Sequence, residues 1–249
     1  MKLLLKFLSC VPLLCTFQGY SQQNLFNIPA GDSTPKGKFF FQQQTNFYSL
    51  TSIEAKNHLV YGVTETWEVG INVINLKMKW GTQHRDKPFL NINSLDRRVP
   101  MTPLVQLTTQ KFFALAEHLK TSIGTQVGFN PMVMAKQPHL THFTYNTWMF
   151  EPRKHVKFVA GPYLSDYRTV GAGNRFGVLL GLELPLRPGL LLMGDFISGR
   201  NATGVSVLGI NYSISKRVHI CLRGMIPNPG SNNKPGVVFE LNLLGYDAH

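Results

Sequence analysis

Alternation of apolar and polar side chains runs through most of the chain, and "LKTSIGTQVGFN" at 119–130 is its clearest stretch. The odd positions carry apolar side chains or threonine, whereas the even positions carry Lys120, Gln126, glycine and small polar residues. A period of two predicts a β-strand with two different faces. Because the polar face has a single charge, we expect it to line a crowded interior while the apolar face contacts lipid.

Strand-like alternation recurs along the chain, with turn-forming residues between the segments. In "TWEVGINVIN", Trp67, Val69 and Ile71 share one face, and Glu68 and Asn72 share the other. This pattern predicts an all-β protein. The twelve predicted strands are 37–48, 56–64, 67–79, 102–111, 118–130, 140–150, 155–165, 174–184, 188–198, 203–213, 216–226 and 235–246.

The connections between these strands alternate in length. An outer-membrane barrel has an even number of antiparallel strands, short periplasmic turns and longer external loops. If the first strand starts in the periplasm, the connections follow this rule except at 112–117 and 199–202. The predicted periplasmic connections are 64–66, 112–117, 151–154, 185–187 and 214–215, and the predicted external ones are 49–55, 80–101, 131–139, 166–173, 199–202 and 227–234.

Aromatic residues gather near the predicted strand ends, as expected for two girdles at the lipid interfaces. The predicted girdle residues are Phe39, Trp67, Phe150, Tyr212 and Tyr246 at the periplasmic side, and Phe47, Tyr48, Trp80 and Phe129 at the external side.

The composition agrees with a barrel in a membrane. Only 15% of the residues are charged, against about 25% in soluble proteins, as expected where a band of surface meets hydrocarbon. A spanning helix needs about 20 apolar residues, whereas the best run after the N-terminus, "FGVLLGLELPL" at 176–186, contains Glu183 and Pro185. A chain without such a helix can span a membrane only as a closed barrel.

The N-terminus predicts a secretory signal peptide over residues 1–21. Two lysines precede an apolar stretch at 7–17, and Gly19 and Ser21 occupy the positions where small residues precede the cleavage site. The alternatives are a buried N-terminal helix and a lipoprotein anchored through one of the cysteines in this stretch.

Cleavage there changes the cysteine count and the charge. Only Cys221 remains, so the mature chain has no internal disulfide, and the loss of Lys2 and Lys6 lowers the net charge from +12 to +10. Anionic lipid headgroups and lipopolysaccharide phosphates suit an exported basic chain, whereas nucleic acid does not.

Ionisable residues on the inner faces are the candidates for solute contact. Asp195 lies in "LLLMGDFISG", where a lipid-facing carboxylate would be costly, so we expect it to face inward together with Leu191 and Met193. Such charges either select solutes in an open lumen or form ion pairs inside a plugged barrel. The predicted lumen-lining residues are Glu68, Lys120, Gln126, Lys157, Glu183, Asp195, Arg223 and Glu240.

The sequence predicts no catalytic residue, metal ligand or cofactor. Some twelve-stranded barrels hydrolyse lipids with a serine, a histidine and an amide or acid on the outer wall, and His142 lies near hydroxyl side chains, but no nucleophile motif such as G-x-S-x-G appears. The pair in "HLTH" at 139–142 would point to opposite faces of a strand, which disfavours a shared metal ion.

Three stretches resemble a known family: "HLVYGVTETWEVGINV" at 58–73, "LLLMGDFISGRNATGVSVLGINYSIS" at 190–215 and "IPNPGSNNKPGVVFELNLLG" at 226–245. They are similar to porin-like outer-membrane barrels of Bacteroidota and to the broader family labelled for the meta-pathway of phenol degradation. The resemblance implies an outer-membrane barrel that passes small molecules, and names no substrate. The chain departs from it at its end, because three residues follow Tyr246, the aromatic residue that the assembly machinery would read.

We therefore expect a signal peptide at 1–21, a periplasmic N-terminal segment at 22–36 and a transmembrane antiparallel up-and-down β-barrel of about twelve strands at 37–249. The expected partners are the lipid bilayer, lipopolysaccharide, the outer-membrane assembly machinery and a small solute. The expected function is passive passage of small solutes, including hydrophobic ones. The alternatives are a sealed structural or adhesion barrel and a lipid-modifying enzyme.

Overall fold

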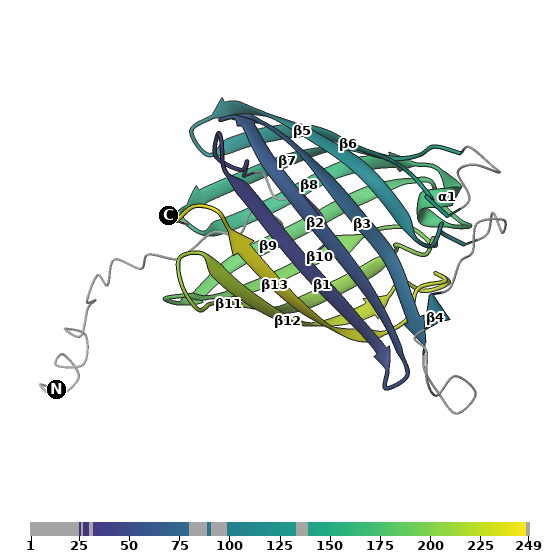
Figure 1. Cartoon of the computed structure of the whole chain (residues 1–249). Coiled ribbons are helices and arrows are strands. Elements are labelled where there is room, and N and C mark those ends of the chain that lie inside the picture. Colours follow the sequence, from purple (N-terminus) through teal and green to yellow (C-terminus); the bar gives the residue numbers. More distant parts are fainter. Residues whose placement is uncertain are drawn as a thin grey trace, which may run out of the picture.

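A closed barrel of twelve antiparallel strands forms the body of the molecule in the computed structural model (Figure 1). The structure describes residues 25, 27–29, 32–79, 89–90, 99–132 and 139–247. Consecutive long strands pair with one another, and β1 closes the barrel by pairing with β13. The predicted up-and-down barrel of twelve strands is confirmed. A further two-residue strand, β4, pairs with the end of β3.

Twelve of the strands have 8 to 13 residues. Their bounds are β1 (Phe39–Ser49), β2 (Ser52–Thr64), β3 (Trp67–Lys79), β5 (Leu104–Ala116), β6 (Leu119–Phe129), β7 (Thr141–Arg153), β8 (Val156–Ser165), β9 (Phe176–Arg187), β10 (Leu190–Ile197), β11 (Val205–Ser213), β12 (Val218–Pro227) and β13 (Gly236–Leu244), and β4 comprises Phe89–Leu90.

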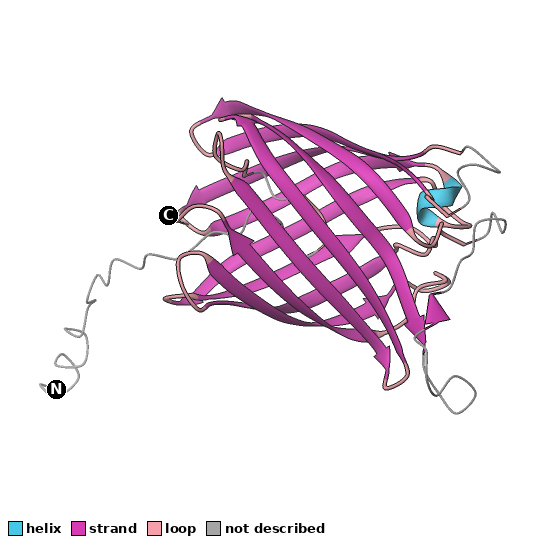
Figure 2. Cartoon of the chain, viewed as in Figure 1, coloured by secondary structure: helices cyan, strands magenta, loops and turns pink. Residues whose placement is uncertain are grey.

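The two ends of the barrel differ in their connections (Figure 2). The end that carries the start of β1 and the end of β13 has short turns only, whereas most connections at the other end are longer. One of the longer connections contains the short helix α1 (Tyr167–Val170), which Asp166 caps by accepting hydrogen bonds from two backbone N–H groups. Short periplasmic turns and longer external loops are the rule for these barrels, so we call the two ends periplasmic and external.

Two predicted connections are wrong because the strands beside them extend further. β2 starts at Ser52, where it pairs with Lys79 of β3, so the predicted external loop at 49–55 shrinks to a turn at 50–51. β5 continues to Ala116, which pairs with Leu119, so the predicted connection at 112–117 becomes a turn at 117–118. Pairing with neighbouring strands extends both elements past the point where the local pattern weakens.

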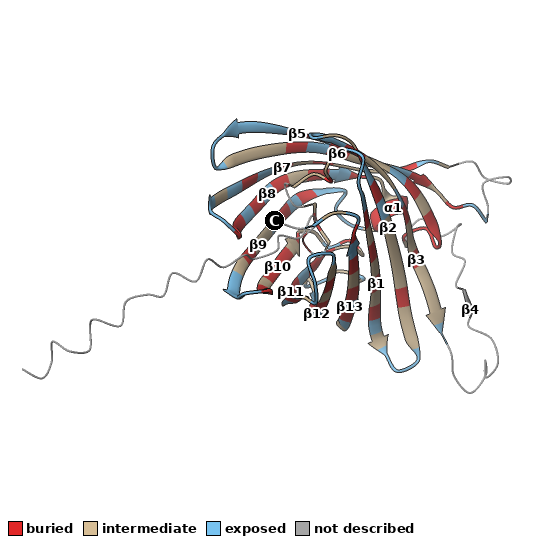
Figure 3. Ribbon diagram, turned by 60° about the vertical axis from the view of Figure 1, so that its left-hand side comes forward, coloured by how far each residue is buried: buried red, intermediate tan, exposed pale blue. Residues whose placement is uncertain are grey.

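Burial alternates along the strands (Figure 3). In β6, Ile123 and Val127 are 55% and 40% exposed, whereas Ser122, which points to the other face of the strand, is fully buried. Leucine, isoleucine, valine and aromatic side chains stay exposed on the outer side of nearly every long strand. A soluble monomer rarely exposes an apolar patch larger than a few hundred Å², so this surface is a belt for lipid. The chain is an outer-membrane barrel.

The aromatic girdles agree with the prediction at most positions that the structure describes. Phe39, Trp67, Phe150 and Tyr212 are exposed at the periplasmic side, and Phe47 is exposed at the external side. The prediction is wrong for two tyrosines, which turn inward because apolar partners are available inside. Tyr246 packs against Phe40, Val60 and Leu244, and Tyr48 packs against the main core cluster.

Some predictions lie outside the described residues. These are the signal peptide at 1–21, Trp80 and most of the external connections at 80–101 and 131–139.

Among the described residues, no helix has the length and apolar character needed to cross a bilayer.

Candidate functional site

The interior of the barrel holds the eight lumen-lining residues that the sequence singled out, seven of them charged. Six of the eight are buried, while Lys120 and Gln126 are partly exposed. The structure brings them together in three groups around Lys157, Asp195 and Arg223, and leaves Glu68 and Gln126 beside a cavity. Their role in selecting solutes stays a prediction.

The first group is a buried ion pair between neighbouring strands. The guanidinium Nη2 of Arg223 in β12 lies 2.9 Å from Oε2 of Glu240 in β13, and both side chains are fully buried. The other carboxylate oxygen, Oε1, accepts a hydrogen bond of 2.8 Å from Asn242. A paired, hydrogen-bonded arrangement is what allows charges to persist away from water.

The other two groups include residues of the N-terminal segment, by which we mean the described residues from 25 to 38. Lys157 of β8 forms an ion pair with Asp32 of this segment and lies 3.7 Å from Glu183 of β9. Lys120 of β6 lies 3.5 Å from the other oxygen of Asp32. One carboxylate of the segment therefore contacts two strands of the wall, β6 and β8.

The N-terminal segment is held at two more polar points. The backbone N–H of Asn27 donates a hydrogen bond to Asp195 of β10. The backbone N–H and the hydroxyl of Thr34 donate to Oε2 of Glu68 in β3, at 2.8 and 2.9 Å. The part of the chain predicted as a periplasmic segment thus has its described residues in contact with the lumen wall.

Apolar contacts also hold the N-terminal segment. Leu25 and Ile28 are 1% exposed and belong to one core cluster with Leu191 and Met193. A Cβ atom at Gly181 would collide with the ends of both Leu25 and Ile28, so the wall has a glycine where the segment lies closest. The inward apolar patch predicted around Asp195 is therefore covered by the protein's own chain.

The segment also crosses the periplasmic mouth. Lys36 forms an isolated parallel bridge with Gly62, and a Cβ atom at that glycine would collide with the carbonyl oxygens of Thr34 and Pro35. In the turn after β7, burial and the nearby Lys154 and Lys157 together lower the pKa of His155 to about 4. A neutral imidazole at neutral pH leaves Lys120 and Lys157 as the cations that face Asp32.

A cavity of about 380 Å³ lies along the opposite wall, formed by β1, β2, β3 and β5. It extends from the external connections down to Glu68 and to residues 25, 27, 28 and 29 of the N-terminal segment. Side-chain amides are the commonest polar groups in its lining. The amide residues are Asn27, Gln42, Gln44, Asn46, Asn57, Asn72, Asn75, Gln106, Gln110, Gln126, Asn232 and Asn233.

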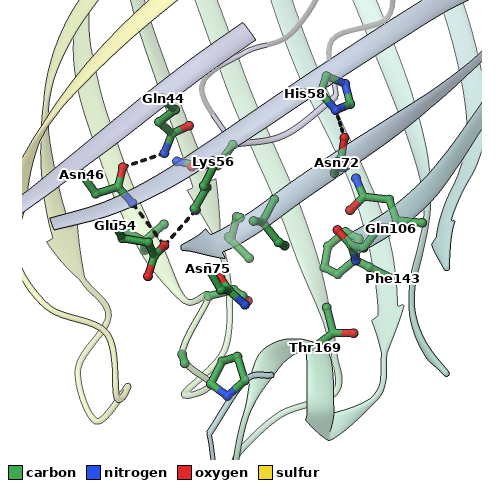
Figure 4. Close-up of a pocket in the computed structure, with 18 of the residues that line it drawn as sticks. Gln44, Asn46, Glu54, Lys56, His58, Asn72, Asn75, Gln106, Phe143 and Thr169 are labelled. Atoms are coloured by element: carbon green, nitrogen blue, oxygen red, sulfur yellow. Dashed lines mark hydrogen bonds and ion pairs between the residues drawn. The ribbon is translucent and has the colours of Figure 1, made fainter. Parts of the chain in front are cut away.

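A short polar network lies at the wall of this cavity (Figure 4). Gln44 donates to Asn46 at 2.7 Å, and Asn46 lies 3.5 Å from Glu54. Glu54 in turn lies 3.8 Å from the ammonium of Lys56 and 3.6 Å from that of Lys77. One carboxylate is thus shared by two cations, each about one third exposed.

The local sequence pattern does not reveal Glu54, Lys77 and Lys79 as cavity residues, for two reasons. Glu54 was assigned to a loop that is in fact part of β2. Lys77 and Lys79 follow an irregularity in β3, where Asn75 adopts a positive φ of 58° and the pairing register shifts. A bulge exchanges the two faces of a strand, so these lysines point into the cavity. Unbroken alternation would place both lysines on the lipid-facing side, and the high energetic cost of that placement is the sequence feature that could have indicated the bulge.

The described residues contain no group of three side chains suited to a metal ion. On the outer wall, Nδ1 of His142 lies 3.5 Å from the hydroxyl of Thr144. A nucleophile and its base are expected at about 2.6–3.2 Å, with a third group that orients the base. In the described part of the chain, Asp166 contacts the backbone N–H of His142 and not its ring.

No protein-family model and no curated protein sequence matches the chain. The fold is that of solved outer-membrane porins. A KdgM porin in complex with disordered oligogalacturonate superposes with a TM-score of 0.53 at 6% identity, over 84% of this chain and 99% of that chain.

A second KdgM porin structure gives a TM-score of 0.54 at 4% identity, over 85% of this chain and 99% of that chain. Outer membrane phospholipase A from Escherichia coli, in a variant of its active site, gives 0.43 at 10% identity over 86% and 91% of the two chains, which is too low to support a comparison of function. The Bacteroidota and phenol-pathway resemblances stay predictions.

Proposed function

We propose that this chain is a porin-like barrel that lets small hydrophilic solutes pass across the outer membrane, with the N-terminal segment as the barrier to passage. The carrying observation is the polar cavity, which runs from the external connections to the N-terminal segment and ends there. Three kinds of non-covalent contact hold the described residues of that segment: ion pairs, hydrogen bonds and apolar packing.

Hydrophilic solutes fit this route better than hydrophobic ones. Amides, hydroxyl groups and charged side chains outnumber apolar residues in the cavity lining, whereas the apolar lumen residues Leu191 and Met193 are buried under the N-terminal segment. Solutes in such pores are selected by the charges and hydrogen-bonding groups of the lining. Contact with lipopolysaccharide and recognition by the assembly machinery belong to this proposal as expectations for an outer-membrane barrel.

The alternative function is a sealed scaffold for adhesion or membrane integrity. The observation that favours it is the buried ionic interior of β8 to β13, where Lys157, Glu183, Arg223 and Glu240 are all at most 2% exposed. An interior of this kind stabilises a plugged barrel and leaves no path along that wall.

Expelling the N-terminal segment from its site tests the two functions against each other. We expect Gly181→Leu to increase the single-channel conductance in planar bilayers, because the bulk of a leucine there occupies the space of the Leu25 and Ile28 side chains. Gly224→Leu is the matched control. It makes the same change in β12 where an added Cβ meets nothing within 4 Å, and should conduct like the wild type.

Heat-modifiable electrophoretic mobility verifies that both variants assemble. If wild type and Gly181→Leu both fail to conduct although assembled, the porin function is wrong and the sealed scaffold is the better account. If the wild type conducts freely and Gly181→Leu conducts equally, the segment is not the barrier.

A further inference from the structure

The cavity carries an excess of positive charge near the external end. Four lysines and two glutamates line it within the described residues, and both glutamates are already engaged. Glu54 lies between Lys56 and Lys77, while Glu68 at the floor accepts two hydrogen bonds from the N-terminal segment. The charged lining residues are Glu54, Lys56, Glu68, Lys77, Lys79 and Lys234.

Below these charges, four neutral polar residues form a row across neighbouring strands. The strand register places Gln42 opposite His58, His58 opposite Asn72, and Asn72 opposite Gln106. Neighbouring strands lie about 4.8 Å apart, so the row places a polar side chain at each step across the wall, and its two central residues, His58 and Asn72, are hydrogen-bonded to each other (Figure 4). Regularly spaced amides and an imidazole suit a ligand that carries several hydroxyl groups.

Gln106 has hydrogen-bonding capacity that the protein leaves unused. Its side chain is fully buried and lines the cavity, yet neither its Nε2 nor its Oε1 atom has a hydrogen-bond partner among the described residues. The Nε2 atom of Gln42, at the other end of the row, is in the same situation. Buried polar atoms are costly unless they are hydrogen-bonded, so these atoms are suited to a ligand's hydroxyl groups.

We propose that the cavity binds a small hydroxyl-rich anion, with its acidic group between Lys56 and Lys77 and its hydroxyls along the row from Gln42 to Gln106. This inference rests on the proposed function because it concerns the same cavity. The volume of about 380 Å³ lies at the low end of the roughly 300–1,000 Å³ of small-molecule sites. The N-terminal segment forms the floor, so the ligand is of monosaccharide size and not an extended chain.

A carboxylate or a phosphate would satisfy the same pair of lysines, and calorimetry on the full-length barrel in detergent separates them. The titrants are glucuronate, glucose 6-phosphate and glucose. We expect either anion to bind at least about tenfold more tightly than glucose, equivalent to about 1.4 kcal/mol, and to weaken as ionic strength rises. Equal affinities for the three titrants, or no binding by either anion, would overturn the proposal.

Variants of opposite sign distinguish binding from a structural role. Lys56→Gln and Lys77→Gln should each weaken the anion about tenfold, whereas Glu54→Gln should strengthen it because a competing carboxylate is removed. Lys216→Gln, in an exposed periplasmic turn, is the matched lysine control and should change nothing. If Glu54→Gln weakens binding as much as the lysine variants do, the cluster is structural and the proposal is wrong.

The binding measurement needs no passage through the barrel. Tight anion binding by a barrel that never conducts would disprove the proposed porin function and leave this inference intact. Conduction by a barrel that binds neither anion more tightly than glucose would disprove this inference and leave the proposed porin function intact.

Discussion

Replacing Arg223 by leucine is expected to lower the free energy of unfolding by about 3–5 kcal/mol, because it leaves a buried carboxylate without its cation. Glu240 is fully buried and lies 2.9 Å from the guanidinium, and the charge of Asp195 also faces Arg223. Urea unfolding in lipid vesicles, followed by tryptophan fluorescence, measures the change as a shift of the midpoint.

The double variant Arg223→Leu/Glu240→Leu is the control for this effect. Replacing both partners of a buried pair by apolar residues is often neutral or stabilising, so the second substitution should recover most of the loss. Arg217→Leu removes an exposed pair with Asp247, whose side chains are 63% and 48% exposed, and should cost less than about 1 kcal/mol. Equal losses for Arg217→Leu and Arg223→Leu would contradict the importance of burial.

An arginine at Leu222 is expected to impair insertion and to cost about 2–4 kcal/mol. Leu222 is 54% exposed near the middle of β12, and its neighbours across the two adjoining strands are the exposed residues Ile210 and Phe239. The new charge would therefore lie in hydrocarbon without a polar neighbour. The fraction folded into vesicles and the urea midpoint measure the effect.

Gln126→Arg is the matched change on the inner face, since Gln126 lines the polar cavity. We expect it to assemble at nearly the wild-type level. Leu222 tests lipid contact more stringently than Ile123 does, because the residues paired with Ile123, Lys111 and Asn146, are themselves polar. Equal tolerance of both arginines would mean that the exposed belt does not face lipid.

The sequence alone determined the number of long strands and the faces of most of their residues. A side-chain period of two is a local property, so the alternation in 119–130 was enough to place Ile123 outside and Ser122 inside. The cost of a carboxylate in hydrocarbon was enough to turn Asp195 inward. The closure of the barrel followed from the same local pattern, because amphipathic strands can span a membrane only when they form a closed barrel.

Only the tertiary structure decided what fills the lumen. The N-terminal segment reaches its partners across long stretches of sequence, since Asn27 and Asp195 are 168 residues apart, and no local period encodes such a contact. The bulge at Asn75 moved Lys77 and Lys79 to the inner face, and strand pairing brought Glu54 and Lys56 into the cavity. Periodicity fixes which face a residue takes, but the partners of a buried charge depend on register and on chain packing from elsewhere.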